Sequence, residues 1–212
     1  MCLLPKGRRL GVCLLALLAI SSLSPFAAAE KLQNLPLILT GSDPRTLAVG
    51  DFNGDGKTDL AYLDGGSPSL LHILLGHGDG TFQHGSDIVL PFGIGGEITI
   101  ADINNDGHLD LLIGGGNQFQ AELAVLLGQG NGAFSAPIVS QFATNTALFA
   151  DIPFTFGVAD FNGDGAADLI VTDPLNQVIY SLLGNNTGSF TLKSTFGNSG
   201  APGQVQIGRA HV

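Results

Sequence analysis

A nine-residue stretch that occurs three times decides the fold of this 212-residue chain. The copies run Asp51-Phe-Asn-Gly-Asp-Gly-Lys-Thr-Asp59, Asp102-Ile-Asn-Asn-Asp-Gly-His-Leu-Asp110 and Asp160-Phe-Asn-Gly-Asp-Gly-Ala-Ala-Asp168. Each copy has oxygen-bearing side chains at positions 1, 3, 5 and 9 and a glycine at position 6. Three carboxylates so close together repel one another unless a cation lies among them. The stretch therefore predicts a loop that wraps a hard, oxygen-seeking cation.

Calcium is the cation that such loops favour. Ca²⁺ takes about 6 to 8 oxygens in flexible geometry, whereas Mg²⁺ requires a tighter octahedron. Each loop offers four side-chain donors, and the backbone carbonyl of position 7 and water can add to them. The glycine at position 6 predicts a sharp turn with positive φ, which a side chain would resist. The alternative is an ordinary turn rich in Asp and Asn that binds nothing, but three copies in register argue against it.

The sequence around each loop predicts strands on both sides. An EF-hand loop would carry a Glu at position 12 and continue as a helix, but position 12 is here Tyr62, Ile113 or Val171. Short apolar runs with β-branched or aromatic members predict buried strands. Those before the loops are residues 46–49, 97–100 and 155–158, and those after the loops are residues 60–63, 111–113 and 169–171.

A second signature, Leu-Leu-Gly followed by a Gly-rich turn and Phe, accompanies each loop. It begins at Leu74, Leu126 and Leu182, and its Phe is Phe82, Phe134 or Phe190. The third strand of each unit is expected to end at Leu-Leu-Gly and the fourth to begin near the Phe. Each unit then has four short antiparallel strands, as in a propeller blade, and must stack on its neighbours to bury its apolar faces. The fold class is therefore all-β.

These paired signatures resemble the FG-GAP/VCBS repeat family, the calcium-loop blades of integrin α-subunit propellers and of many secreted bacterial proteins. The resemblance implies a β-propeller with one Ca²⁺ between the first two strands of each blade, or three in this chain. It also implies the ligands, with position 7 acting through its carbonyl. They are Asp51, Asn53, Asp55, Lys57 and Asp59; Asp102, Asn104, Asp106, His108 and Asp110; and Asp160, Asn162, Asp164, Ala166 and Asp168.

The number of repeats departs from the family, because a closed propeller has about 4 to 8 blades. Three repeats are visible, at about residues 46–93, 97–142 and 154–203, after a lead-in strand or linker at 30–45. Truncation, completion of the ring by partner chains, or a curved stack with capped ends would each explain the count, and we favour truncation. Residues 204–212 then begin a further blade or form a non-native tail, since residues 207–212 resemble a translated sequencing adapter.

The N-terminus has the pattern of a secretory signal peptide. Lys6, Arg8 and Arg9 precede an apolar run from Leu10 to Ile20 and the small residues 27–29. We expect cleavage after residue 29. A membrane anchor needs about 20 apolar residues, and residues 21–25 interrupt the run. Cleavage removes both cysteines, leaving no disulfide and no stable membrane span.

Composition limits the function classes. After cleavage, five basic residues face eighteen acidic ones, of which nine are the Asp residues of the three loops. A chain with so few Lys and Arg is not expected to bind nucleic acid. The histidines show no metal-ligand spacing, no catalytic motif is found, and His72 is expected to pack within a strand.

We therefore expect a secreted or cell-surface, non-catalytic calcium scaffold that binds an extracellular protein or glycan by adhesion. The alternative is the propeller portion of a larger secreted enzyme, a polysaccharide lyase or hydrolase, whose catalytic residues lie elsewhere.

Overall fold

The computed structural model describes residues 43–66, 68–117, 120–144, 154–174 and 176–197. All of them belong to one unit, Pro36–Val212. The predicted signal peptide, nearly all of the lead-in segment and the tail at 204–212 lie outside the described residues. Among the residues described, no helix is long and apolar enough to cross a membrane.

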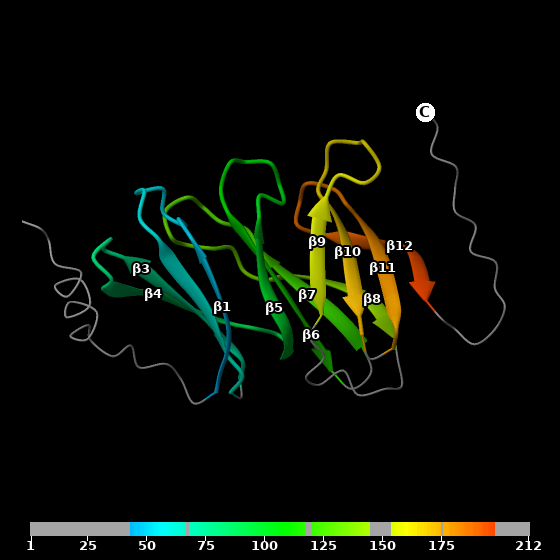
Figure 1. Ribbon diagram of the computed structural model, residues 1–212, viewed down its shortest axis with the longest axis horizontal. Helices are drawn as coiled ribbons and strands as arrows, with labels where there is room; N and C mark the ends of the chain where they lie inside the picture. The colour runs from blue at the N-terminus through cyan, green and yellow to red at the C-terminus, as the bar shows by residue number, and fades with distance from the viewer. Residues whose placement is uncertain (1–42, 67, 118–119, 145–153, 175, 198–212) are drawn as a thin grey trace, which may run out of the picture. The chain divides into compact units, whose positions relative to one another are not determined.

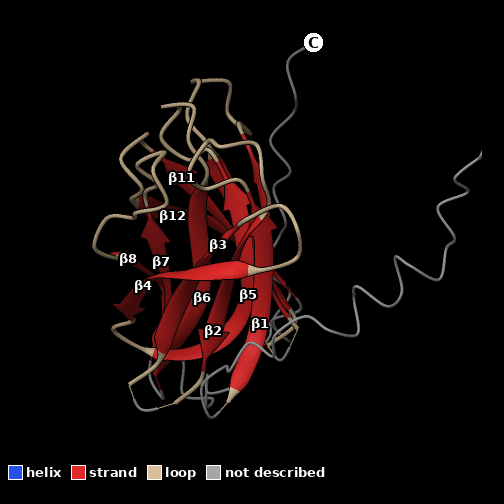
Figure 2. Ribbon diagram, turned by 90° about the vertical axis from the view of Figure 1, so that its left-hand side faces the viewer, coloured by secondary structure: helices blue, strands red, loops and turns tan. Residues whose placement is uncertain are grey.

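In the described residues, twelve strands form three four-stranded antiparallel sheets, in each of which neighbours in sequence are neighbours in space (Figure 1). The first sheet comprises β1 (Pro44–Gly50), β2 (Asp59–Asp64), β3 (Leu70–Gly76) and β4 (Phe82–Val89). The second comprises β5 (Gly93–Ala101), β6 (Asp110–Asn117), β7 (Gln120–Leu126) and β8 (Ile138–Thr144). The third comprises β9 (Thr155–Ala159), β10 (Asp168–Asp173), β11 (Val178–Gly184) and β12 (Phe190–Gly197). The prediction of an all-β chain with four-stranded, blade-like repeats is confirmed, and Figure 2 shows strands joined by loops.

The fourth strand of the second repeat begins later than its signature predicts. β4 begins at Phe82 and β12 at Phe190, as expected, but β8 begins at Ile138. Phe134 makes only an isolated bridge with Gly128. Pro137 directly precedes the strand, and its missing N–H cannot donate to a ladder. The expectation that this strand starts near Phe134 is therefore wrong, because the strand begins four residues later.

The second sheet is buried on both faces because its strands alternate between two cores. Leu111 and Ile113 of β6 pack in the core shared with the first sheet, whereas Leu112 between them packs in the core shared with the third. All three side chains are fully buried. A continuous apolar run is what a strand covered on both faces requires.

The two flanking sheets each turn one face away from the second. In the first sheet, Ala61, Leu63, Leu71 and Ile73 point into the shared core. The alternate residues of β2 and β3, with β1 and β4 beside them, form what we call the outer face of the first sheet. On it, Leu47 is 65 % exposed.

Candidate metal centres

Each acidic loop connects the first two strands of its sheet. The loops at 51–59, 102–110 and 160–168 follow β1, β5 and β9 and end on the first residue of β2, β6 and β10. The prediction that they are strand-to-strand connections is confirmed. In each loop the side chains of positions 1, 3 and 5 are exposed or half-buried, whereas the Asp at position 9 is fully buried. The loop therefore has an open mouth and a buried base.

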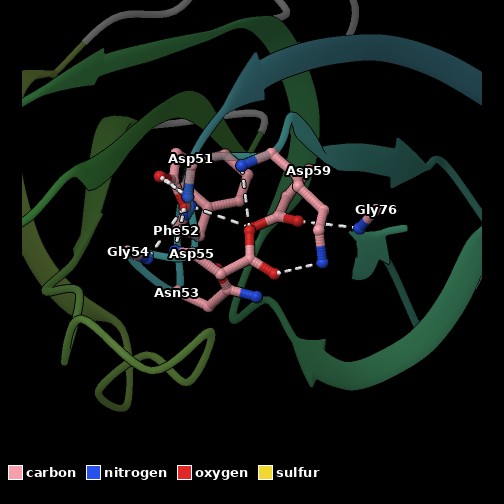
Figure 3. Close-up of polar contacts among 9 residues, drawn as sticks. Asp51, Phe52, Asn53, Gly54, Asp55, Asp59 and Gly76 are labelled. Carbon is pink, nitrogen blue, oxygen red and sulfur yellow. Dashed lines mark hydrogen bonds and ion pairs between the residues drawn. The ribbon is translucent and has the colours of Figure 1, made fainter. Parts of the chain in front are cut away.

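At the mouth of the first loop, the Asp at position 1 organises the backbone (Figure 3). One oxygen of Asp51 accepts the N–H of Gly54 at 2.8 Å, and the other accepts that of Gly56 at 2.8 Å. Asn53 Oδ1 accepts the N–H of Asp55 at 2.9 Å. The loop is thus curled around the Asp51 carboxylate.

The other two loops repeat this network. Asp102 Oδ2 accepts the N–H of Gly107 at 2.9 Å, and Asp160 Oδ2 accepts that of Gly165 at 2.9 Å. Position 5 accepts the N–H of position 7 in all three loops, from Lys57, His108 and Ala166. The residue at position 7 is variable because its side chain takes no part in this bond.

The backbone geometry confirms the glycine requirement at position 6 and shows a second one at position 4. Gly56, Gly107 and Gly165 have φ values of 79°, 85° and 86°. Position 4 also has positive φ, with 59° at Asn105 of the second loop. Asn is among the few residues with a side chain that tolerate this region. The sequence argument did not identify position 4, although only Gly or Asn occurs there.

The base of each loop is a buried Asp whose two oxygens both accept backbone N–H groups. In the first loop, Asp59 Oδ2 accepts from Phe52 at 2.9 Å and Oδ1 accepts from Gly76 at 2.7 Å (Figure 3). Asp110 pairs with Ile103 and Gly128, and Asp168 with Phe161 and Gly184. The position-9 carboxylate therefore joins the start of its loop to the end of the third strand.

This bond explains the glycine of the Leu-Leu-Gly signature. A Cβ atom placed on Gly76 would lie 2.0 Å from the carbonyl oxygen of Thr58, and one on Gly128 would lie 2.2 Å from that of Leu109. No side chain fits where the strand approaches the loop so closely. The near-constant spacing of the two signatures in the sequence was the signal that they meet.

The electrostatics of the loops differ between mouth and base. The pKa of Asp55 is lowered, chiefly by a hydrogen bond from the backbone N–H of Lys57. The pKa of Asp106 is also lowered, chiefly by a hydrogen bond from the side chain of Asn104. Hydrogen bonds from backbone N–H groups, chiefly that of Gly165, lower the pKa of Asp160. Burial instead raises the pKa of Asp110, against the N–H groups of Gly128 and Ile103, and the nearby charges of Asp106 and Asp102 raise it further. The mouth favours ionised carboxylates.

The donor set fits a hard divalent cation. Carboxylate, amide and carbonyl oxygens are the ligands that Ca²⁺ takes, and each loop carries all three kinds. Among the described residues, however, no three loop carboxylates bring ligand atoms within 4.8 Å of one another. Lys57 pairs with Asp55 at 3.1 Å in the first loop. Within the described part of the chain, Asp160, Asp164 and Asp168 form no ion pair, so the third loop carries its charge uncompensated. The predicted ligand set itself stays a prediction.

Neighbouring loops are hydrogen-bonded across the sheets. Asn105 Nδ2 donates to the carbonyl of Gly165 at 2.9 Å and to Asn186 Oδ1 at 3.1 Å, which connects the second loop to the third. The N–H of Gly132 donates to the carbonyl of Phe52 at 2.9 Å, which connects the first loop to the turn after β7. The loops therefore lie along one rim of the three sheets (Figure 1).

A family model described as "FG-GAP-like repeat" matches residues 51–113 and 102–171. Together these matches span more than half of the chain, and each begins at position 1 of a loop and ends within the second strand of the next repeat. The chain belongs to the FG-GAP-like repeat family. The resemblance inferred from the paired signatures is confirmed.

Curated relatives carry the same kind of sequence in much longer proteins. Cartilage acidic protein 1 of Homo sapiens is 30 % identical over 139 residues, covering 60 % of this chain and 20 % of that protein. Its counterpart in Mus musculus is 30 % identical over 141 residues, with the same coverage. The FG-GAP-like chain thus spans about a fifth of the length of the curated relatives it matches.

Among solved structures, a chain of the Photorhabdus luminescens Tc holotoxin pore aligns with a TM-score of 0.37 at 22 % identity. The alignment covers 70 % of this FG-GAP-like chain and 8 % of the toxin chain.

Proposed function

We propose that this FG-GAP-like chain is an exported, calcium-stabilised scaffold that binds an extracellular protein or glycan through its loop-bearing rim and has no catalytic role of its own. The observation that carries the proposal is the threefold recurrence of one loop geometry. In each copy the side chains of positions 1, 3 and 5 lie at an exposed or half-buried mouth, above a buried Asp whose two oxygens accept backbone N–H groups.

In this proposal the mouth carboxylates and the carbonyl of position 7 hold one Ca²⁺ per loop. The bound ion would neutralise the repulsion among the loop carboxylates. The residues at positions 1, 3 and 5 are already oriented by backbone N–H groups, so little side-chain freedom is lost on binding. Affinity of about 10⁻⁴ to 10⁻³ M, typical of extracellular modules, would fill the sites outside a cell.

The gain in stability follows from binding to the folded state alone. When calcium is tenfold above Kd, each loop contributes about 1.4 kcal/mol, and three independent loops contribute about 4 kcal/mol. This is a large fraction of the roughly 5 to 15 kcal/mol by which a domain is stable. Calcium would then stabilise the folded chain, as disulfides stabilise other exported proteins.

The same geometry argues against proton-transfer chemistry in the loops. Both oxygens of Asp59 are occupied by N–H groups deep in the structure, and no substrate can reach a fully buried carboxylate. The exposed side chains of the rim are instead available for contact, and Phe161 in the third loop is 52 % exposed.

Thermal unfolding of the chain, with calcium and with chelator, tests the proposal. We expect calcium to raise the melting temperature, and Asp55→Asn, Asp106→Asn and Asp164→Asn each to remove about a third of the rise. Glu97→Gln is the matched control, because Glu97 is an exposed carboxylate on β5 outside the loops. A rise that is unchanged in all three loop variants would overturn the calcium assignment.

A further inference from the structure

A second group of potential metal ligands lies on the outer face of the first sheet, away from the acidic loops. His72 of β3 and His84 and Asp87 of β4 bring three ligand atoms within 4.8 Å of one another. His72 Nδ1 lies 2.6 Å from Asp87 Oδ1, and His84 Nε2 lies 2.9 Å from the same oxygen. We call these three residues the His–His–Asp cluster.

A β-bulge creates this cluster. In the β3–β4 ladder, His72 lies opposite Asp87 and Leu74 lies opposite His84, with a shift of register between them. Side chains three residues apart in a regular strand point to opposite faces, because the period is two. The bulge gives β4 one extra residue here and so returns His84 and Asp87 to the same face, a known effect of bulges near functional sites.

The same bulge occurs in the third sheet without the ligands. There, Tyr180 lies opposite Thr195 and Leu182 opposite Leu192, so that Tyr180, Leu192 and Thr195 occupy the equivalent places. In the second sheet, Ala124 lies opposite Val139. The bulge thus recurs in the first and third sheets, whereas the second sheet has its register shift between Ala121 and Glu122 instead. Among the described residues, two imidazoles and a carboxylate occur on the bulge only in the first repeat.

The histidine of β3 is built into the sheet. His72 is 8 % exposed, and its ring stacks on that of Tyr62, its cross-strand neighbour, with centroids 4.6 Å apart and an interplanar angle of 19°. Its Nε2 is buried without a hydrogen-bond partner. Its Nδ1 instead faces Asp87 of the neighbouring strand, so packing holds the ring with that nitrogen toward the cluster.

The chemistry of the cluster suits a borderline metal. Two imidazole nitrogens and one carboxylate oxygen are a typical zinc set, and they do not suit Ca²⁺. With Zn–ligand distances near 2.0 Å, tetrahedral ligand atoms lie about 3.3 Å apart. The two N···O distances here are therefore within 1 Å of a zinc geometry, and the exposed His84 side chain is free to adjust.

One side of the cluster is open to solvent. The Asp87 side chain is 44 % exposed and that of His84 is 58 % exposed, which leaves one side of the cluster open for water as a fourth ligand.

We propose that His72 Nδ1, His84 Nε2 and Asp87 Oδ1 form a binding site for one zinc-type divalent metal ion, separate from the calcium loops. The sequence argument found no His spacing typical of metal sites, because the ligands meet across a ladder and through a bulge that local spacing does not show.

Titration calorimetry with Zn²⁺ on the untagged chain, in saturating Ca²⁺, tests the site. We expect one zinc ion per chain, and at least about a tenfold loss of affinity in His84→Ala and in His72→Ala, since even outer-shell changes cost about 10- to 100-fold. Ala occupies the place of His72 in the second repeat, so the fold tolerates that change. His77→Ala is the matched control, because His77 is exposed in the next turn and outside the cluster.

Co²⁺ as a spectroscopic probe provides a second readout. A d–d absorption spectrum of a four- or five-coordinate ion is expected in the wild type and in His77→Ala, and should be lost in His84→Ala. Zinc affinity that is equal in the wild type and His84→Ala, or lost equally in His77→Ala, would overturn the proposal. Neither outcome bears on the calcium-dependent rise in melting temperature, so the two proposals can fail separately.

Discussion

At the scale of single residues, the buried Asp at the base of each loop differs most from its neighbours. The mouth carboxylates hold a curl that faces solvent, whereas Asp59 holds two backbone segments together in the interior. Residues of the same type in one nonapeptide therefore have separate roles, which substitution can distinguish.

Asp59→Ala is expected to destabilise the calcium-free protein by about 2 to 6 kcal/mol, because it leaves the buried N–H groups of Phe52 and Gly76 unpaired at about 1 to 3 kcal/mol each. Asp55→Ala, at the exposed mouth, should cost less than about 1 kcal/mol under the same conditions. Urea unfolding in chelator measures both. Equal losses in the two variants would show that the base Asp has no special structural role.

Two glycine substitutions separate steric exclusion from backbone strain. Gly76→Ala places a Cβ atom 2.0 Å from the Thr58 carbonyl oxygen and should cost at least the 1 to 3 kcal/mol typical of overpacking. Gly56→Ala meets no atom within 4 Å but has a φ of 79°, which costs about 1 to 2 kcal/mol. Urea unfolding in chelator should rank Gly76→Ala as the more damaging, and the reverse order would contradict the close approach.

Acid should destabilise the calcium-free protein. The pKa values of Asp55, Asp106 and Asp160 are lowered in the folded state, so their contribution is complete above the ordinary value of 3.8 and is lost as pH falls through the lowered values. Asp110, with a raised pKa, acts in the opposite direction, but Asp87 outside the loops, whose pKa is also lowered, acts with the other three. Melting temperature measured from pH 6 to pH 3 in chelator should fall, and a flat profile would contradict the lowered pKa values.

The sequence predicted much of this residue chemistry. The loop spacing predicted the positive φ of the glycine at position 6, because it follows from local backbone geometry, whereas the ligand set stays a prediction. The partner of Asp59 was not predicted, since the hydrogen bond to Gly76 joins residues that only the β2–β3 pairing brings together. The His–His–Asp cluster was missed for the same reason.

At the scale of elements, each loop draws its donors from one sheet, yet the loops are not equally independent. Asn105 of the second loop donates one hydrogen bond to Gly165 of the third loop and another to Asn186 in the turn after β11, whereas the first and third loops are separated by the whole second sheet. Energetic coupling between loops should follow these contacts.

A double-mutant cycle on the calcium-dependent gain in stability tests this coupling. Asp55→Asn and Asp164→Asn should be additive within about 0.5 kcal/mol. Asp106→Asn and Asp164→Asn should show an interaction energy above that, which Asn105→Ala should abolish. The measurement is the free energy of unfolding with calcium and with chelator. Additivity in both cycles would mean that the Asn105 contacts carry no coupling.

Element boundaries were predicted less well than element types. Hydrophobic runs identified the strands correctly because each strand is covered on at least one face. The late start of β8 depends on Pro137, whose effect on the ladder was not considered, and the bulge in β4 has no signature in hydrophobic pattern alone. Both are decided by cross-strand hydrogen bonding, which a single strand does not reveal.

At the scale of the whole described unit, apolar side chains remain exposed on the two flanking sheets. Leu47 and Val49 of β1 are 65 % and 54 % exposed, and Ile179 and Phe196 of the third sheet are both 41 % exposed. Their counterparts in the second sheet face a neighbouring sheet. Exposed apolar patches of this kind mark interaction or aggregation surfaces.

We expect the chain to self-associate with rising concentration, through these faces and through unpaired strand edges. Light scattering measures this self-association in the wild type and in the double variant Leu47→Lys/Phe196→Lys. The double variant should remain monomeric at higher concentration than the wild type. Thr46→Lys, a change in charge at a neighbouring half-buried position of β1, is the control. A wild-type chain that stays monomeric at all concentrations would contradict the expectation.

Every ladder in the three sheets joins strands that follow one another along the chain. The search for partners during folding is therefore short, and chains with such local pairing fold faster than those with distant pairing. Each four-stranded sheet can close as soon as its last strand has left the ribosome, and the finished sheet then offers a template on which the next one packs. Folding should thus proceed from the N-terminal sheet onward, in step with synthesis.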